Sequence, residues 1–307
     1  MRNDEHIKRN PLWGIGRRPC LLIAIERHPL RGILRRSFLL ILFTFHLSPL
    51  TSTAQVDYSV DSLRVANAEW SIDTLEGFYL KRYQFGEGAL FCSAQHLCII
   101  EIPARSHRRL AFTSDTALTA VSTLAQRCNA YAAVNGSFFD MKQGFPICYL
   151  RIGGAPVGEN TPQAEDSVHR KYYQYATIAL RNGRAALLVP DSSRLWEEDL
   201  KDSNIMTSGP MLLTEGRVVP QRDDRTFVTR RHNRTALGIR PDGTTLLVVA
   251  DGRFKHQAEG LTLPELQRVM RWLGCTEAIN LDGGGSTTMY VHDRPDAEVM
   301  AVKWRAP

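Results

Sequence analysis

The chain has 307 residues, of which 43% are hydrophobic and 23% are charged. This balance is ordinary for a soluble globular protein and excludes an intrinsically disordered chain, which would be poorer in apolar residues. The formal net charge of +6 is concentrated in the N-terminal segment. It gives no support to a nucleic-acid partner, which would need a basic patch on the folded domain itself.

Residues 1–54 have the pattern of a basic leader followed by a signal peptide. Arg and Lys crowd residues 1–36, an apolar run covers Ser37–Leu47, and Ser52-Thr53-Ala54 is a small-x-small site of the kind that signal peptidases cut. The apolar run, at roughly 11 residues, is too short to cross a bilayer comfortably as a helix. A signal anchor is the alternative. We expect a mature chain that starts near Gln55, is exported to the periplasm, cell envelope or medium, and has no stable membrane span.

The first part of the mature chain, residues 55–129, is predicted to be a β-rich extension with one helix. Short apolar runs at Gly77–Tyr83, Ala89–Phe91 and Leu97–Ile102 alternate with polar breaks, which is typical of strands. Apolar residues at helical spacing then predict a helix over Ser114–Cys128, with its N-cap at the first or second residue.

Residues 130–303 are predicted to form the catalytic domain. The expected strands are Ala130–Asn135, Tyr175–Leu180, Ala185–Val189, Met211–Leu213, Arg217–Val219, Ala236–Ile239 and Thr244–Val249. Asn-Gly, Glu-Gly and Asp-Gly turns separate three pairs of them, as expected for tight hairpins. A helix over Leu263–Leu273 has Thr262 as its N-cap and Gly274 as its stop. The fold class is therefore α+β, with a mixed, mostly antiparallel sheet, a few packed helices and an N-terminal extension.

Five cysteines follow the leader, at positions Cys92, Cys98, Cys128, Cys148 and Cys275. Because five is odd, at least one thiol stays free even in an oxidising compartment. The spacing leaves the pairing open, and Cys92 with Cys98 or Cys128 with Cys148 are possibilities. A zinc site would need closer pairs, such as two cysteines separated by two residues, and none is present.

The most informative segment is Asp282-Gly283-Gly284-Gly285-Ser286-Thr287, at the end of an apolar strand. Three successive glycines remove every Cβ, so backbone N–H groups can approach a phosphate or carboxylate closely. The hydroxyls of Ser286 and Thr287 add donors. A glycine-rich turn capped by Asp282 is the alternative interpretation of these residues alone.

Other polar groups also stand at strand ends, where loops converge and sites tend to form. Asn135 precedes a glycine within Asn-Gly-Ser-Phe-Phe, although a plain hairpin turn explains it equally well, and Ser208 lies in a polar turn. Arg234 and Thr235 open an apolar strand; Arg234 would be costly to bury without an anion, and Arg suits phosphate. Asp251 ends another apolar run. Two carboxylates could cleave a glycosidic bond, bind a metal or merely cap turns.

Together these blocks resemble the phosphodiester glycosidase family over roughly residues 131–302. The matching motifs are NGSFF at 135–139, TSGPML at 207–212, RTALGI at 234–239, ADGR at 250–253, GLTLPELQRVMRWLGC at 260–275 and INLDGGGSTTM at 279–289. The chain departs from the family at Ser208-Gly209-Pro210, where relatives often carry a second glycine. The extension over residues 55–129 has no counterpart in the resemblance.

The resemblance implies a secreted hydrolase that cleaves the bond between a sugar anomeric carbon and a phosphodiester, acting on a phosphorylated glycan or envelope polymer. It implies catalytic roles for Asp282, Asp251, Asn135 and Arg234, and no metal or other cofactor. The residues expected to hold the substrate phosphate are Thr235, Ser208, Gly283, Gly284, Gly285, Ser286 and Thr287. The alternatives are a module that binds envelope glycans without turning them over, and a metal-dependent phosphodiesterase.

Overall fold

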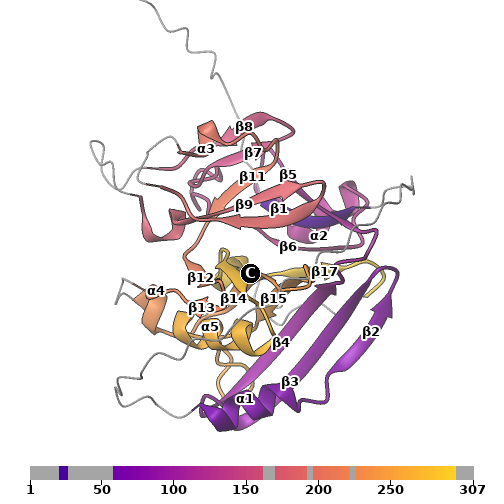
Figure 1. The fold of residues 1–307 in the computed structure, drawn as a ribbon, viewed down its shortest axis with the longest axis vertical. Helices are drawn as coiled ribbons and strands as arrows, with labels where there is room; N and C mark the ends of the chain where they lie inside the picture. The colour runs from indigo at the N-terminus through magenta and orange to yellow at the C-terminus, as the bar shows by residue number, and fades with distance from the viewer. Residues whose placement is uncertain (1–20, 27–57, 162–169, 192–195, 222–225, 295–307) are drawn as a thin grey trace, which may run out of the picture.

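The computed structural model describes residues 21–26, 58–161, 170–191, 196–221 and 226–294. In this part of the chain the strands form three sheets, in which every strand pair is antiparallel. A few helices pack on them (Figure 1). The predicted α+β class is therefore confirmed, with the strands divided among three sheets where the sequence suggested one.

The largest sheet has eight strands and carries the strand ends of interest. Its order is β13 (Arg217–Val218), β12 (Met211–Thr214), β16 (Glu277–Asn280), β14 (Arg234–Ile239), β15 (Thr245–Ala250), β4 (Ser93–Ile102), β3 (Phe78–Leu90) and β2 (Ser71–Leu75). Strand β4, from the predicted extension, pairs with β15, and Cys98 lies opposite Val249. The extension and the C-terminal part thus share one sheet, whereas their boundary at residue 130 stays a prediction.

Two smaller sheets cover one face of the large one. The first contains β10 (Arg184–Leu188), β9 (Ala176–Arg181), β11 (Ile205–Ser208), β7 (Leu150–Ile152) and β8 (Ala155–Gly158). The second contains β17 (Met289–Val291), β6 (Ala132–Asn135), β1 (Leu21–Glu26) and β5 (Arg109–Ser114). Strand β1 belongs to the predicted leader and pairs with both β5 and β6. The apolar run and cleavage site of that leader lie outside the described residues.

Alternation along the central strands creates an apolar core on each face of the large sheet. On one face, Leu237, Leu247 and Ile279 pack against residues of the smaller sheets, such as Val134 and Ile178. On the other face, alternate residues of β14 and β15 pack against the helical layer. The helices are α1 (Ser59–Ala66), α2 (Val121–Arg127), α3 (Trp196–Asp199), α4 (Thr226–Thr229) and α5 (Leu263–Trp272), with 3-10 turns at Tyr172–Gln174 and Gly284–Ser286. No helix of the described residues is long and apolar enough to cross a membrane.

The helix predicted over Ser114–Cys128 is wrong in its first half, because α2 begins only at Val121. Ser114 ends strand β5, and the Asp115 carboxylate accepts hydrogen bonds from the Thr116 N–H and the Thr119 hydroxyl, both at 2.7 Å. A short acidic side chain that satisfies nearby backbone in this way stabilises a turn at the expense of a helix.

The other long helix is confirmed together with its cap. The Thr262 hydroxyl accepts a hydrogen bond from the Glu265 N–H at 3.2 Å, and the Glu265 carboxylate accepts one from the Thr262 N–H at 2.8 Å. This reciprocal arrangement is a capping box. Helix α5 then leads through Gly274 into β16, which ends beside Asp282.

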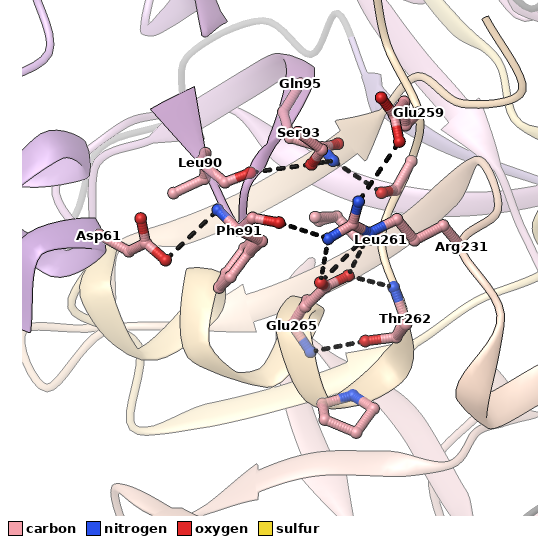
Figure 2. A network of polar contacts seen from close by, with 12 residues as sticks. Asp61, Leu90, Phe91, Ser93, Gln95, Arg231, Glu259, Leu261, Thr262 and Glu265 are labelled. Atoms are coloured by element: carbon pink, nitrogen blue, oxygen red, sulfur yellow. Dashed lines mark hydrogen bonds and ion pairs between the residues drawn. The ribbon is translucent and has the colours of Figure 1, made fainter. Parts of the chain in front are cut away.

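The loop in front of β14 is fixed by Arg231 (Figure 2). Its guanidinium donates to the Glu265 carboxylate at 2.7 Å and to the Phe91 carbonyl at 2.6 Å. The Asp61 carboxylate in turn accepts a hydrogen bond from the Phe91 N–H at 3.3 Å. One cation therefore ties the start of α5, the turn between β3 and β4, and helix α1 to the segment that enters β14.

The five cysteines that follow the leader are all free. Cys98, Cys148 and Cys275 are buried, and Cys92 and Cys128 are exposed. Neither pairing suggested by the spacing is formed in this structure.

Replacement of Thr262 by Ala should lower the free energy of unfolding by about 1 kcal/mol, since the helix loses its N-cap acceptor. Urea denaturation of the full chain measures this change. The matched control is Arg271→Ala at the exposed far end of α5, which should change stability by less than about 0.5 kcal/mol. Equal effects of the two substitutions would contradict the capping assignment.

Candidate active site

The candidate site lies where β6 and β16 end and β14 begins, with Asp282 at its centre. Asp282 is half-buried, and its carboxylate accepts a hydrogen bond from the Gly283 N–H at 2.8 Å. Its own N–H donates to the Gly136 carbonyl at 3.0 Å. Burial raises the pKa of Asp282 to about 6, although hydrogen bonds from Ser286 and Gly283 act in the opposite direction. A carboxylate tuned in this way is suited to act as a base or nucleophile near neutral pH.

Asn135 fixes the backbone at this point. Its amide nitrogen donates to the Asp282 carbonyl at 2.8 Å. Its amide oxygen accepts hydrogen bonds from the Thr235 hydroxyl at 2.7 Å and from the Thr288 N–H at 3.1 Å. Since Asn135 ends β6 and Thr235 lies in β14, one buried amide joins the four-stranded sheet to the eight-stranded sheet beside Asp282.

Two glycine loops meet on the backbone of Asn233. A Cβ on Gly252 would lie 2.5 Å from the Asn233 nitrogen, and one on Gly283 would lie 2.7 Å from the Asn233 oxygen. That same oxygen accepts a hydrogen bond from the Gly284 N–H at 2.9 Å. Neighbouring backbone cannot yield as a flexible side chain could, so both positions require glycine. This contact brings the loop that follows Asp251 against the loop that follows Asp282.

Asp251 is fully buried and forms a pair with a residue that the sequence did not suggest. Its carboxylate lies 2.7 Å from His96 Nδ1, and its N–H donates to the His96 carbonyl at 3.0 Å. Burial lowers the pKa of His96, but the hydrogen bonds with Asp251 and Cys98, and then the charges of these two groups, raise it overall to about 10. The imidazole is therefore a cation at neutral pH. Asp251 is engaged by this pair, whereas Asp282 is not.

Only the register of the sheet could have identified His96. It lies on β4, two positions before Cys98, which is opposite Val249 on β15. Asp251 follows β15 by one residue and thus reaches the same end of the sheet. No local motif surrounds His96, so the sequence carries no separate signal for it.

Arg234 is buried, as its place at the start of β14 suggested, but its hydrogen bonds go to backbone carbonyls. Its guanidinium donates to the carbonyls of Leu261 at 2.8 Å, Phe227 at 2.7 Å and Arg230 at 3.1 Å. The Phe227 ring centroid lies 5.0 Å from the guanidinium carbon. These contacts hold two loops together, which is a structural task; the predicted phosphate contact of Arg234 stays a prediction.

The predicted hydroxyls occupy different settings. Ser286 forms a hydrogen bond with the Asp282 carboxylate. The Thr287 hydroxyl is buried beside the glycine turn and has no hydrogen-bond partner among the described residues. Ser208 is fully buried and donates to the Asn280 carbonyl at 3.1 Å, so it supports the end of β16. Gly285, in contrast, is exposed.

A buried ion pair behind the site was not anticipated. The Glu197 carboxylate accepts from Arg170 Nη2 at 2.7 Å and from the Thr207 hydroxyl at 2.8 Å. Burial raises the pKa of Glu197, but Arg170 and the hydrogen bonds from Thr207 and Asn160 lower it overall. Burial raises the pKa of the Cys148 thiol to about 12, and the charges of Asp282 and Glu197 act in the same direction. Thr207, in the predicted Thr-Ser-Gly-Pro turn, was the available signal for this cluster.

The described side chains form no evident metal site. Among them, no group of three or more His, Cys, Asp or Glu residues is placed to hold a metal ion. Asp251 and Asp282 accordingly appear as separate carboxylates, one paired with a histidine and one beside the glycine turn.

The segment that carries these residues matches a known protein family. The model of the phosphodiester glycosidase family matches residues 128–305, more than half of the chain. The chain belongs to the phosphodiester glycosidase family. All the predicted site residues lie inside the matched segment, whereas His96 lies before it.

Individual relatives match over shorter stretches. The mouse N-acetylglucosamine-1-phosphodiester alpha-N-acetylglucosaminidase is 35% identical over 85 residues, which are 26% of this chain and 16% of the mouse protein. The SPbeta prophage-derived uncharacterized protein YomE of Bacillus subtilis is 36% identical over 64 residues, 21% of this chain and 10% of that protein. The matches thus span less than a fifth of the length of these curated relatives.

Solved structures show the same fold. The catalytic domain of the zebrafish N-acetylglucosamine-1-phosphodiester alpha-N-acetylglucosaminidase, auto-inhibited by its pro-peptide, has a TM-score of 0.50 at 19% identity, with 73% of each chain covered. A hypothetical protein from Synechocystis also has a TM-score of 0.50, at 15% identity, covering 74% of this chain and 60% of the other. At these identities the likeness concerns the fold alone.

Replacement of His96 by Gln should destabilise the chain by about 3 kcal/mol at pH 7, because the Asp251 carboxylate is left buried without its cation. The pKa of His96 is raised from 6.5 to about 10, so the pair stabilises fully below pH 6.5 and its contribution is lost as pH rises through 10. Chemical denaturation from pH 6 to 10 should show the difference from wild type shrinking. The control His107→Gln removes an exposed histidine. If the difference in free energy of unfolding between wild type and His96→Gln stays constant with pH, the pairing is refuted.

Proposed function

We propose that this chain is a hydrolase that cleaves the bond between a sugar anomeric carbon and a phosphodiester oxygen. The observation that carries the proposal is Asp282, a half-buried carboxylate with a pKa raised to about 6, placed beside three successive glycines. Membership of the phosphodiester glycosidase family supports the reaction class. The activity named for the mouse relative supports an N-acetylglucosamine 1-phosphodiester as the type of substrate to test first.

In this reaction a nucleophile or base is needed more than a general acid. A phosphate ester leaves readily as an anion, so protonation of the leaving oxygen contributes little, and positioning and charge neutralisation matter more. As a nucleophile, ionised Asp282 would form a bond to the anomeric carbon while the electron pair of the broken bond leaves with the phosphate. Water would then hydrolyse the resulting ester. As a base, Asp282 would instead take the proton of the attacking water. Both routes require the carboxylate form.

The surrounding groups have separate tasks in this proposal. Asn135 holds the backbone of Asp282 and acts as a positioning residue. Asp251 supports the site through the loop that it anchors to His96. The phosphate is received by the turn Gly283–Gly285 with Ser286 and Thr287, while Thr235 holds Asn135 and Ser208 supports β16. The proposed substrate is a phosphorylated glycan or envelope polymer.

Replacement of Asp282 by Asn should lower turnover of sugar 1-phosphodiesters by at least about 1000-fold, since it removes the nucleophile or base. In the wild-type protein, kcat/KM should fall as pH drops through about 6, where Asp282 becomes protonated. Release of free sugar by the full chain, with and without chelator, measures both. The matched control is Asp199→Asn, at an exposed position on α3.

The variant should not be less stable than wild type. Because the pKa of Asp282 is raised on folding, its ionisation costs stability as pH rises towards 6, and Asn removes that cost. Full activity of a folded Asp282→Asn would refute the assignment. Binding of sugar phosphates without turnover by wild type would favour a glycan-binding module, and activity abolished by chelator would favour a metal-dependent phosphodiesterase.

We further propose that the chain is exported. The basic leader, the apolar run over Ser37–Leu47 and the small residues before Gln55 support this proposal. Expression with the native leader in a bacterial host, followed by N-terminal sequencing of the exported product, should find a start near Gln55. Cleavage there would also remove β1 from between β5 and β6. Retention of the whole chain in the cytoplasm would contradict the proposal.

A further inference from the structure

Arg253 lies directly over the glycine turn. Its Nη2 atom is 2.9 Å from the place where a Cβ on Gly284 would stand, and the arginine is exposed. Gly284 itself has a φ of 61°, so a side chain there would be strained as well as crowded. The absence of a side chain at position 284 therefore leaves room for a guanidinium beside the turn.

The backbone holds Arg253 in an uncommon conformation. Its φ is 68°, in the left-handed region that non-glycine residues seldom adopt. The preceding Gly252 is packed against the Asn233 backbone, and the following Phe254 forms a bridge with Ala258. Such strain persists only where the surroundings enforce it, and it is often found at functional sites.

No carboxylate of the described residues pairs with Arg253. The contact that its guanidinium makes is with His232 Nδ1, at 3.5 Å. Burial lowers the pKa of His232, and the charges of Arg234, Arg253 and Arg230 lower it further. Arg234 is buried with its hydrogen bonds directed to carbonyls. Arg253 thus brings a positive charge to the glycine turn, and among the described residues no carboxylate is paired with it.

A second group at the turn also lacks a partner. The Thr287 hydroxyl is 1% exposed and makes no hydrogen bond with the described residues. A buried hydroxyl that is left unsatisfied destabilises the fold, and a hydrogen bond to a ligand can offset that loss. Thr287 follows Gly285, the last glycine of the turn, by two residues.

We propose that Arg253 is the side chain that binds the phosphate group of the substrate, over the turn Gly283–Gly285. The planar guanidinium can donate two parallel hydrogen bonds to phosphate oxygens, and glycine allows the backbone to approach them. The inference rests on the proposed function for the identity of the substrate. It differs from the sequence-based expectation, which gave the phosphate to Arg234.

The test uses the full chain with inorganic phosphate as the probe, so it does not depend on turnover. Calorimetric titration should show phosphate binding that weakens at least about 10-fold in Arg253→Ala and less in Arg253→Lys, which keeps the charge but not the fork. The control Arg271→Ala, at an exposed position on α5, should bind phosphate as wild type does. Circular dichroism establishes that each variant is folded.

NMR titration of His232 gives a second readout that a structural role for Arg253 would not move in the same way. Bound phosphate should raise the pKa of His232 in wild type, because it offsets the arginine charges. In Arg253→Ala the pKa should be higher without phosphate and unchanged by it. Phosphate binding equal to wild type in a folded Arg253→Ala, or no phosphate binding by wild type, overturns the inference. Arg253-dependent binding without hydrolysis of any substrate supports it and refutes only the proposed function.

Discussion

The candidate site depends on one close contact between backbones. Gly252 and Gly283 both press against Asn233, at distances that leave no space for a Cβ on either glycine. This contact sets the loop after Asp251 against the loop after Asp282, and it fixes where Arg253 can reach. Because backbone atoms cannot move aside as side chains do, the geometry of the site tolerates no side chain at these two positions. Each of the two Asp-Gly motifs therefore has a glycine for the same reason, which is the nearby backbone of Asn233.

The two aspartates differ because their surroundings differ. Asp251 is fully buried and bound to His96, whose raised pKa keeps the pair charged at neutral pH. Asp282 is half-buried, and burial without a cation partner raises its pKa to about 6. An ion pair holds a loop in place, whereas a carboxylate with a raised pKa is available for chemistry. The environments therefore support a division of roles that two equivalent carboxylates would not.

The arginines at the turn illustrate the same principle. Arg234 and Arg253 carry the same charge, but Arg234 lies inside the protein with three carbonyls as acceptors, and Arg253 lies on the surface of the turn. A buried guanidinium whose donors are occupied serves the fold and contributes a positive field. An exposed guanidinium without a carboxylate partner can bind an anion directly. Arg231, a third arginine of this region, is held by Glu265 and ties the loop to α5 (Figure 2).

Local sequence determined those features whose cause is local. The N-cap of α5, three hairpin turns and the central strands were predicted because each depends on a few adjacent residues. The α2 boundary was misjudged because the Asp115 side chain competes with helical hydrogen bonds. The family motifs likewise identified Asp282 and its glycines, since the carboxylate, the Cβ-free turn and the hydroxyls are contiguous.

The tertiary structure alone decided which residues the strand register and the chain packing bring together. His96 reaches Asp251 only through the pairing of β4 with β15, and Arg253 reaches Gly284 only because two glycines share Asn233. Those contacts join residues far apart in sequence, so their local patterns carry no trace of the partner.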